Sequence, residues 1–141
     1  MNKFKKILGK DYIKVKLSLL WLFVMLNYIY ADILTLMDSS ALNDILSGAL
    51  GITPLFLFVG AILMEIPIAM VFLSLILKNN INRWANIIAG IIKTLAVLGS
   101  LFVGTPTLYY AFFAIIEIVA TSYIVYLAWK WSEPKSESKI V

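Results

Sequence analysis

Four long apolar segments constrain the fold of this chain more than any other feature. Each is close to the roughly 20 residues that an α-helix needs to cross the hydrocarbon core of a bilayer. They cover residues 17–37, 54–77, 84–103 and 107–129. Only helices and closed barrels satisfy every backbone polar group in lipid. The sequence therefore predicts an all-α fold, a four-helix transmembrane bundle over residues 17–131.

The composition argues against a soluble domain. Hydrophobic residues make up 62% of the 141 residues, and charged residues only 14%. A typical soluble domain has about 25% charged residues, and a small domain leaves much of its surface in water. A chain this apolar therefore needs lipid around it in place of water.

The basic residues are concentrated at the start of the chain. The net charge is +4, and six of the twelve Lys and Arg residues lie in the first sixteen positions. The rest of the chain has no basic face that could follow the phosphates of a nucleic acid. We therefore expect a lipid bilayer with an anionic inner leaflet as the partner, and no nucleic acid.

The distribution of Lys and Arg also predicts the orientation of the bundle. Basic residues occur in the arm at residues 1–16, between the second and third segments, and around the tail at residues 132–141. The other two loops have none. By the positive-inside rule, both termini are expected in the cytoplasm of a multi-pass protein in the cell membrane.

The arm is amphipathic at helical spacing. It fits an interfacial helix or a flexible topology signal, and the tail is polar.

The loop after the first segment is long enough to hold a short helix. Asp38, Ser39 and Ser40 are favourable N-cap residues, and apolar residues then recur at helical spacing. The pattern predicts a surface helix at about residues 40–50 that ends near Gly48 or Gly51.

The second and fourth segments have a polar pattern in common. The first copy comprises Thr53, Pro54, Glu65 and Lys78, and the second comprises Thr105, Pro106, Glu117 and Lys130, at a constant offset of 52 residues. The pattern is typical of a parallel pseudo-repeat about an axis along the membrane normal. In the alternative interpretation, the Pro and Lys residues simply mark helix ends, and only the glutamates match by more than chance.

Four ionisable residues lie inside the apolar segments. Counting from the segment ends places Glu65, Lys93 and Glu117 near the bilayer midplane, and Asp32 further out, one turn from Tyr28. A charge that faces lipid is costly, so these residues are expected to face the bundle interior and to be functional. All five are candidates for a ligand- and proton-binding site, with Asp32 and Tyr28 as its outer approach.

If the three midplane groups meet, Lys93 can neutralise one glutamate, and the other is expected to be protonated near neutral pH. In the alternative interpretation, a buried ion pair only sets the helix register, and the second glutamate is hydrogen-bonded to Tyr or Thr. Pro67 adds a backbone feature, because it leaves the carbonyl of Leu63 without its intrahelical donor and can kink the helix.

The absence of two residue types limits the chemistry. The chain has no Cys and no His, which excludes disulfides, Cys- or His-ligated metal sites and an imidazole base. We expect no cofactor, no metal and no catalytic residue. Enzymatic activity stays open but is not favoured, because no nucleophile–base pair is visible.

Three functions remain. The first is a small transporter or ligand-binding protein for an unknown small molecule or lipid. The second is a non-catalytic accessory or scaffold protein that binds a partner. The third is a membrane enzyme acting on a lipid or quinone through carboxylate acid–base chemistry. Four helices leave little room for a pore, which favours a homodimer.

Several stretches together resemble a known family. They are NYIYADILTLMD at residues 27–38, EIPIAMVFLS at 65–74, NRWANIIAG at 82–90 and PTLYYAFFAIIEI at 106–118. They are similar to an uncharacterised family of small prokaryotic four-helix membrane proteins, a domain of unknown function, and more loosely to the DoxX-like group. The resemblance implies the membrane topology and a bacterial inner membrane. It implies no activity.

Overall fold

The computed structural model describes residues 11–102 and 106–131 of the chain. The described residues form five helices and no strand: α2 (Tyr12–Met37), α3 (Ser39–Leu46), α4 (Pro54–Ile76), α5 (Asn79–Ser100) and α6 (Leu108–Lys130). Apart from α3, each is long and apolar enough to cross a membrane. The predicted all-α fold with four membrane-spanning helices is thus confirmed, and it supports a multi-pass membrane protein.

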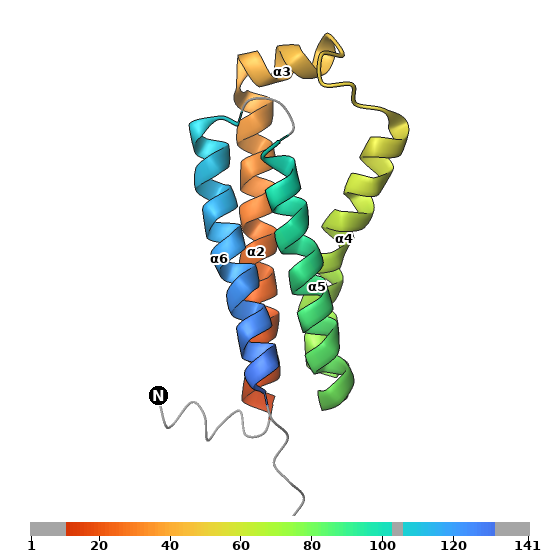
Figure 1. Ribbon diagram of the computed structural model, residues 1–141, viewed down its shortest axis with the longest axis vertical. Helices are drawn as coiled ribbons and strands as arrows, with labels where there is room; N and C mark the ends of the chain where they lie inside the picture. Colours follow the sequence, from red (N-terminus) through yellow and green to blue (C-terminus); the bar gives the residue numbers. More distant parts are fainter. Residues whose placement is uncertain (1–10, 103–105, 132–141) are drawn as a thin grey trace, which may run out of the picture.

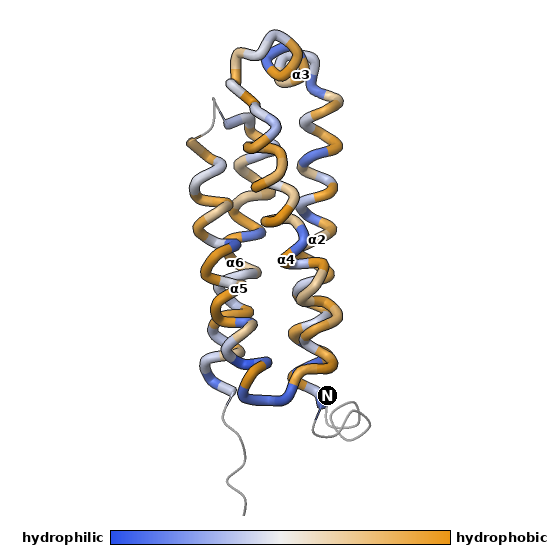
Figure 2. The backbone as a smooth tube through the Cα atoms, turned by 90° about the vertical axis from the view of Figure 1, so that its right-hand side faces the viewer, coloured by the Kyte–Doolittle hydropathy of each residue, from blue (hydrophilic) through white to orange (hydrophobic). Residues whose placement is uncertain are grey.

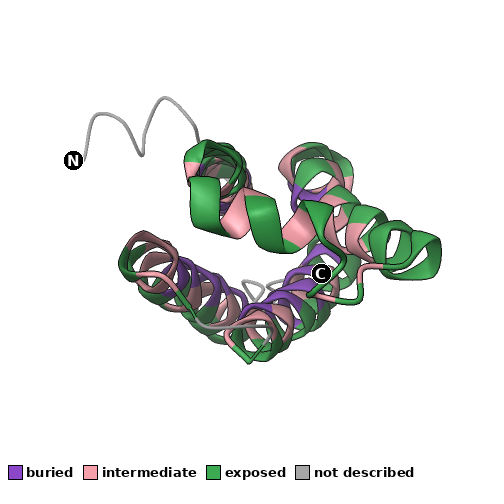
Figure 3. Cartoon of the chain, turned by 90° about the horizontal axis from the view of Figure 1, so that it is seen from above, coloured by how far each residue is buried: buried purple, intermediate pink, exposed green. Residues whose placement is uncertain are grey.

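The four long helices run alternately up and down (Figure 1). The start of α2, the α4–α5 turn and the end of α6 lie at one end of the bundle, which we call the basal end. The short helix α3 crosses the opposite end, which we call the α3 end (Figures 1 and 3). The helices are coloured mainly hydrophobic along their length, whereas the α4–α5 turn is hydrophilic (Figure 2). The cytoplasmic orientation of the basal end stays a prediction.

Two helices begin earlier than the apolar segments suggest. Helix α2 begins at Tyr12 rather than residue 17, and α5 begins at Asn79 rather than residue 84. Lys14 and Lys16 are compatible with the first turns of α2, because long basic side chains can carry their charge to the membrane surface. In α5, the early polar residue Asn82 is fully buried and hydrogen-bonded, so the helix extends through it. Residues 1–10 of the predicted arm and the tail at 132–141 lie outside the described residues.

The loop helix α3 begins at a side-chain cap. The carboxylate of Asp38 accepts hydrogen bonds from the backbone N–H groups of Ser40 at 2.9 Å and Ala41 at 3.4 Å. After Leu46 the chain turns through Gly48, whose φ of 74° lies in the left-handed region that favours glycine. The helix is therefore shorter than the expected 40–50.

The two copies of the polar pattern begin their helices differently. Pro54 occupies the first turn of α4, and the hydroxyl of Thr53 caps it by accepting from the N–H of Phe56 at 3.1 Å. In α6 the N-cap is Thr107, so Pro106 precedes the cap, and no side-chain cap bond forms. Thr105 lies outside the described residues. The matching prolines are therefore not at equivalent helix positions.

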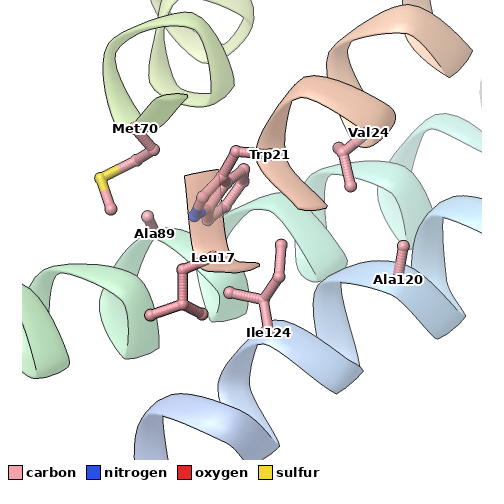
Figure 4. Packing of buried hydrophobic residues seen from close by; sticks show 7 residues of the cluster. All are labelled: Leu17, Trp21, Val24, Met70, Ala89, Ala120 and Ile124. Atoms are coloured by element: carbon pink, nitrogen blue, oxygen red, sulfur yellow. The ribbon is translucent and has the colours of Figure 1, made fainter. Parts of the chain in front are cut away.

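The packed core lies in the basal half and joins all four long helices (Figure 4). Its buried residues are Leu17, Trp21, Val24, Met70, Ala89, Ala120 and Ile124. Small residues let α5 approach α6 closely. At Gly90, an added Cβ would lie 2.5 Å from Cγ2 of Val125, so a larger residue would force this side chain or the helix to shift.

A fully buried polar network crosses this core. The indole N–H of Trp21 donates to Oδ1 of Asn86 at 2.7 Å, and the hydroxyl of Ser74 donates to the same oxygen at 3.3 Å. The amide of Asn82 donates to the Ser74 carbonyl at 2.6 Å, and the amide of Asn86 donates to Oδ1 of Asn82 at 2.7 Å. The network joins α2, α4 and α5, and no pattern in the sequence predicted it.

Replacing Asn86 by alanine should destabilise the bundle strongly. The change leaves the indole N–H of Trp21 and the hydroxyl of Ser74 without their acceptor. Buried groups left unpaired cost about 1–3 kcal/mol each. The apparent free energy of unfolding in mixed micelles measures the effect. Asn80→Ala, at an exposed position of the same helix, is the matched control, and equal effects of the two changes would contradict a structural role for the network.

Candidate functional site

A cavity opens between the four long helices on the α3 side of the core. Its volume is about 380 Å³, and most of its wall is apolar. Next to it, the first half of α4 stands apart from the other helices (Figure 1). The polar residues in its wall come from α2, α5 and α6, and they are Tyr28, Asp32, Lys93, Ser100, Tyr110 and Glu117.

Lys93 is the buried cation of this cavity, with 1% of its surface exposed. Its ammonium donates a hydrogen bond to the backbone carbonyl of Leu63 in α4 at 3.1 Å. Within a helix this carbonyl would accept from the N–H four residues later, but that residue is Pro67, which has none. The lysine therefore supplies the donor that the proline removes, and it joins α5 to α4 at this point.

The ammonium of Lys93 has a second partner in α2. It lies 3.8 Å from the ring centroid of Tyr28, a cation–π contact that is strengthened by the removal of water. The hydroxyl of Tyr28 is buried and has no hydrogen-bond partner among the described residues. Tyr28 thus contacts the ammonium of Lys93 through its ring, while its own hydroxyl oxygen has no hydrogen-bond partner among the described residues.

Glu117 and Asp32 are the two carboxyl groups of the cavity. Glu117 is 4% exposed. Both lie close enough to Lys93 for their charges to interact with it, Glu117 more strongly. Among the described residues, however, the only salt bridge joins Lys14 to Asp11. Among the described residues, the carboxyl groups of Glu117 and Asp32 also accept no hydrogen bond that could take the place of a salt bridge. Lys93 and Glu117 therefore share a cavity without forming the buried ion pair of the alternative interpretation.

Glu65 does not reach this site. It is exposed on α4, whose cavity-lining residues include Leu63 and Met64. Successive residues of a helix are about 100° apart, so the carboxyl group of Glu65 turns away from the wall that its neighbours form. This differs from the expectation that Glu65, Lys93 and Glu117 meet. The two glutamates aligned by the polar pattern thus have opposite environments.

A second cavity adjoins the first towards α3. Its volume is about 540 Å³, and it shares Asp32, Phe56, Ser100 and Tyr110 with the first. Tyr109 lines this second cavity, and its hydroxyl donates to the carboxylate of Asp38 at 3.4 Å, which links α6 to the start of α3. Asp32 lines both cavities but is exposed rather than enclosed in the bundle interior as expected, so its role as an outer approach stays a prediction. Tyr28 lines only the inner cavity.

The site is suited to binding. Among the described residues, no three Asp or Glu side chains gather closely enough to hold a metal ion. The inner cavity offers one ammonium, two carboxyl groups and phenolic hydroxyls on an apolar background. A few polar groups in an apolar cleft are the usual construction of a small-molecule site. Tyr110 and Ser100 were not among the site residues predicted from the sequence. Tyr110 lies on the same face of α6 as Glu117, and Ser100 lies on the same face of α5 as Lys93.

The bond between Lys93 and the Leu63 carbonyl should show energetic coupling to Pro67. Lys93→Met leaves the carbonyl without a donor, whereas in a Pro67→Ala background the restored N–H satisfies it. A double-mutant cycle of unfolding free energies should give a coupling energy of about 1 kcal/mol or more. Additive effects would show that the lysine does not stabilise the kink.

Comparison with known proteins agrees with the architecture. No curated protein and no solved structure matches the chain. A family model described as a family of unknown function (DUF6326) matches residues 5–138, nearly the whole sequence. With the four apolar helices observed here, this match shows that the chain belongs to the DUF6326 family.

Proposed function

We propose that this protein binds an amphipathic small molecule or lipid in its inner cavity, as a carrier or as a binding protein of the cell membrane. The basal end would face the cytoplasm, following the basic residues there. The observation that carries the proposal is a cavity of about 380 Å³ whose wall holds the buried groups of Lys93 and Glu117.

The energetics of the bundle support this function. A carboxyl group inside a membrane protein is costly, and an apolar residue of similar size would pack at less cost. Glu117 is nevertheless buried without a salt bridge, and the Tyr28 hydroxyl is buried without a hydrogen bond. Groups held at such a cost are typical of binding sites rather than of structural cores. The basal half shows the contrast, since each buried side chain of its Asn–Ser–Trp network has a partner.

The arrangement of α4 offers a route for the ligand. Its second half is anchored in the core by Met70 and in the polar network by Ser74. Its first half lines both cavities through Phe56, which stays 51% exposed. Pro67 separates the two halves and lowers the cost of bending between them. Movement of the first half about Pro67 would open the cavity to the acyl chains.

Thiol accessibility tests the proposal, because the natural chain has no cysteine. Ala96→Cys places a thiol in the cavity wall, and Ala89→Cys places one two turns earlier on the same helix, in the packed core. A small thiol reagent should modify the first variant in liposomes at least about tenfold faster, since core residues are close-packed. A mixture of single-chain amphiphiles should slow the reaction at the first position. Equal rates at both positions, or no protection by any amphiphile, would contradict the function.

One observation favours a second role, as an accessory protein that pairs with a second copy of itself. Glu65 lies in the middle of α4 and is exposed. A carboxyl group facing acyl chains there is costly. Ala61, one turn earlier, is also exposed and small enough to allow a close helix–helix approach. A neighbouring α4 would cover both residues and let the two Glu65 carboxyl groups share one proton in a hydrogen bond.

Disulfide trapping tests this pairing. Ala61→Cys should form a covalent dimer on mild oxidation in membranes. Ile115→Cys, on the exposed face of α6 at 64% exposure, should not. Adding Glu65→Leu to the Ala61→Cys variant should reduce the dimer yield, since it removes the polar contact. Equal yields from Ala61→Cys and Ile115→Cys would indicate random collision and exclude the role.

A further inference from the structure

We propose that the ligand of the inner cavity is an amphipathic amine with a single positive charge, whose ammonium group binds between Glu117 and Asp32. The inference rests on the proposed function and specifies its ligand class. It depends on how the three ionisable groups of the cavity are partnered, and on the space beside them.

The charges in the cavity wall do not balance. The ionisable residues with acidic or basic side chains that line it are Asp32, Lys93 and Glu117. Two carboxylates and one ammonium leave one negative charge in excess. Glu117 lies in the buried part of the wall, where an uncompensated charge is unfavourable, whereas Asp32 is exposed on α2. One additional cation or a proton would balance the excess. A bound monocation makes the set neutral with both carboxyl groups ionised.

The ammonium of the resident lysine is held by groups other than the two carboxyl groups. Its ammonium is engaged by the Leu63 carbonyl at 3.1 Å and by the ring of Tyr28 at 3.8 Å. In the described part of the chain it forms no salt bridge with Glu117 or Asp32. Pro67 is the cause, because the unpaired carbonyl it creates competes for the lysine. The proline in α4 thereby leaves two carboxyl groups free for the cation of a ligand.

The environment of Glu117 is a second observation that favours a cationic ligand. The residue is 96% buried, because only 4% of its surface is exposed, and its side chain borders the cavity without a hydrogen-bond partner in the described residues. An ammonium group donates up to three hydrogen bonds and forms strong charge-assisted bonds with carboxylates. An anionic ligand would instead lie beside two carboxyl groups, and it would have to draw Lys93 away from the Leu63 carbonyl.

The remainder of the wall suits the apolar part of such a molecule. Phe56, Val59 and Phe113 line the cavity around the polar groups. At about 380 Å³ the space lies within the range of small-molecule sites, and an alkyl chain of moderate length fits it. Apolar burial would supply the affinity, and the carboxyl groups would select the charge of the head group.

A matched head-group series tests the inference in the Ala96→Cys protein in liposomes. Octylamine, octanol and octanoate have the same chain with a cationic, a neutral and an anionic head. We expect octylamine to protect the thiol at the lowest concentration. Glu117→Gln and Asp32→Asn should each raise its half-protecting concentration about tenfold, as expected for loss of a charge-assisted hydrogen bond. Protection by octanol should not change in these variants. Octanol therefore controls for the partitioning of the amphiphiles into the bilayer.

Glu65→Gln is the control, because it removes a carboxyl group at similar depth on a face that does not line the cavity. It should leave protection by octylamine unchanged. If octanol or octanoate protects as well as octylamine, or if Glu117→Gln and Glu65→Gln have equal effects, the ligand class is wrong while the cavity still binds amphiphiles. If no member of the series protects but the amphiphile mixture does, the class is also wrong. If nothing protects, the proposed function fails as well.

Discussion

The hydrogen bond from Lys93 to the Leu63 carbonyl joins α5 to α4 between the packed half of the bundle and the half that holds the cavity. On its basal side, apolar and small side chains fill the space between all four long helices. On its α3 side, α4 departs from the bundle and a cavity remains. The bond forms because a polar group in a membrane protein needs a partner within the protein. Pro67 removes one donor from α4, and α5 supplies another through a buried lysine.

The buried polar groups of the core network and those of the cavity differ in how they are hydrogen-bonded. In the core network, the side chains of Trp21, Ser74 and Asn86 are hydrogen-bonded to one another. Outside this network, Nε of Arg83 in the basal half is buried without a hydrogen-bond partner among the described residues. Near the α3 end, Glu117 and the hydroxyl of Tyr28 are buried without hydrogen bonds in the described residues. The first arrangement stabilises a single packing of the helices. The second is unfavourable for stability alone, which is why the proposed function is assigned to the cavity.

Glu65 and Glu117 show how far sequence symmetry predicts structure. Their spacing from the preceding Thr-Pro pair is identical, yet Glu117 is 4% exposed in the cavity wall and Glu65 is exposed outside it. Each residue along a helix is rotated by about 100° from the one before, and α6 begins two residues later in its copy of the pattern than α4 does. Helix α6 begins after Thr107 and α4 after Thr53, so the pattern does not place the two glutamates alike.

The sequence alone determined the number of long helices and their near-exact ends at Met37, Pro54 and Lys130. These follow from segment length and hydrophobicity, which are local properties. It also indicated the free carbonyl of Leu63, because the effect of proline is local. Only the tertiary structure decided that Lys93 binds this carbonyl, that Glu65 faces outwards, and that Asn86 connects Trp21 to Ser74. In lipid nearly every helix face is apolar, so hydrophobic periodicity does not distinguish the packed face from the exposed one.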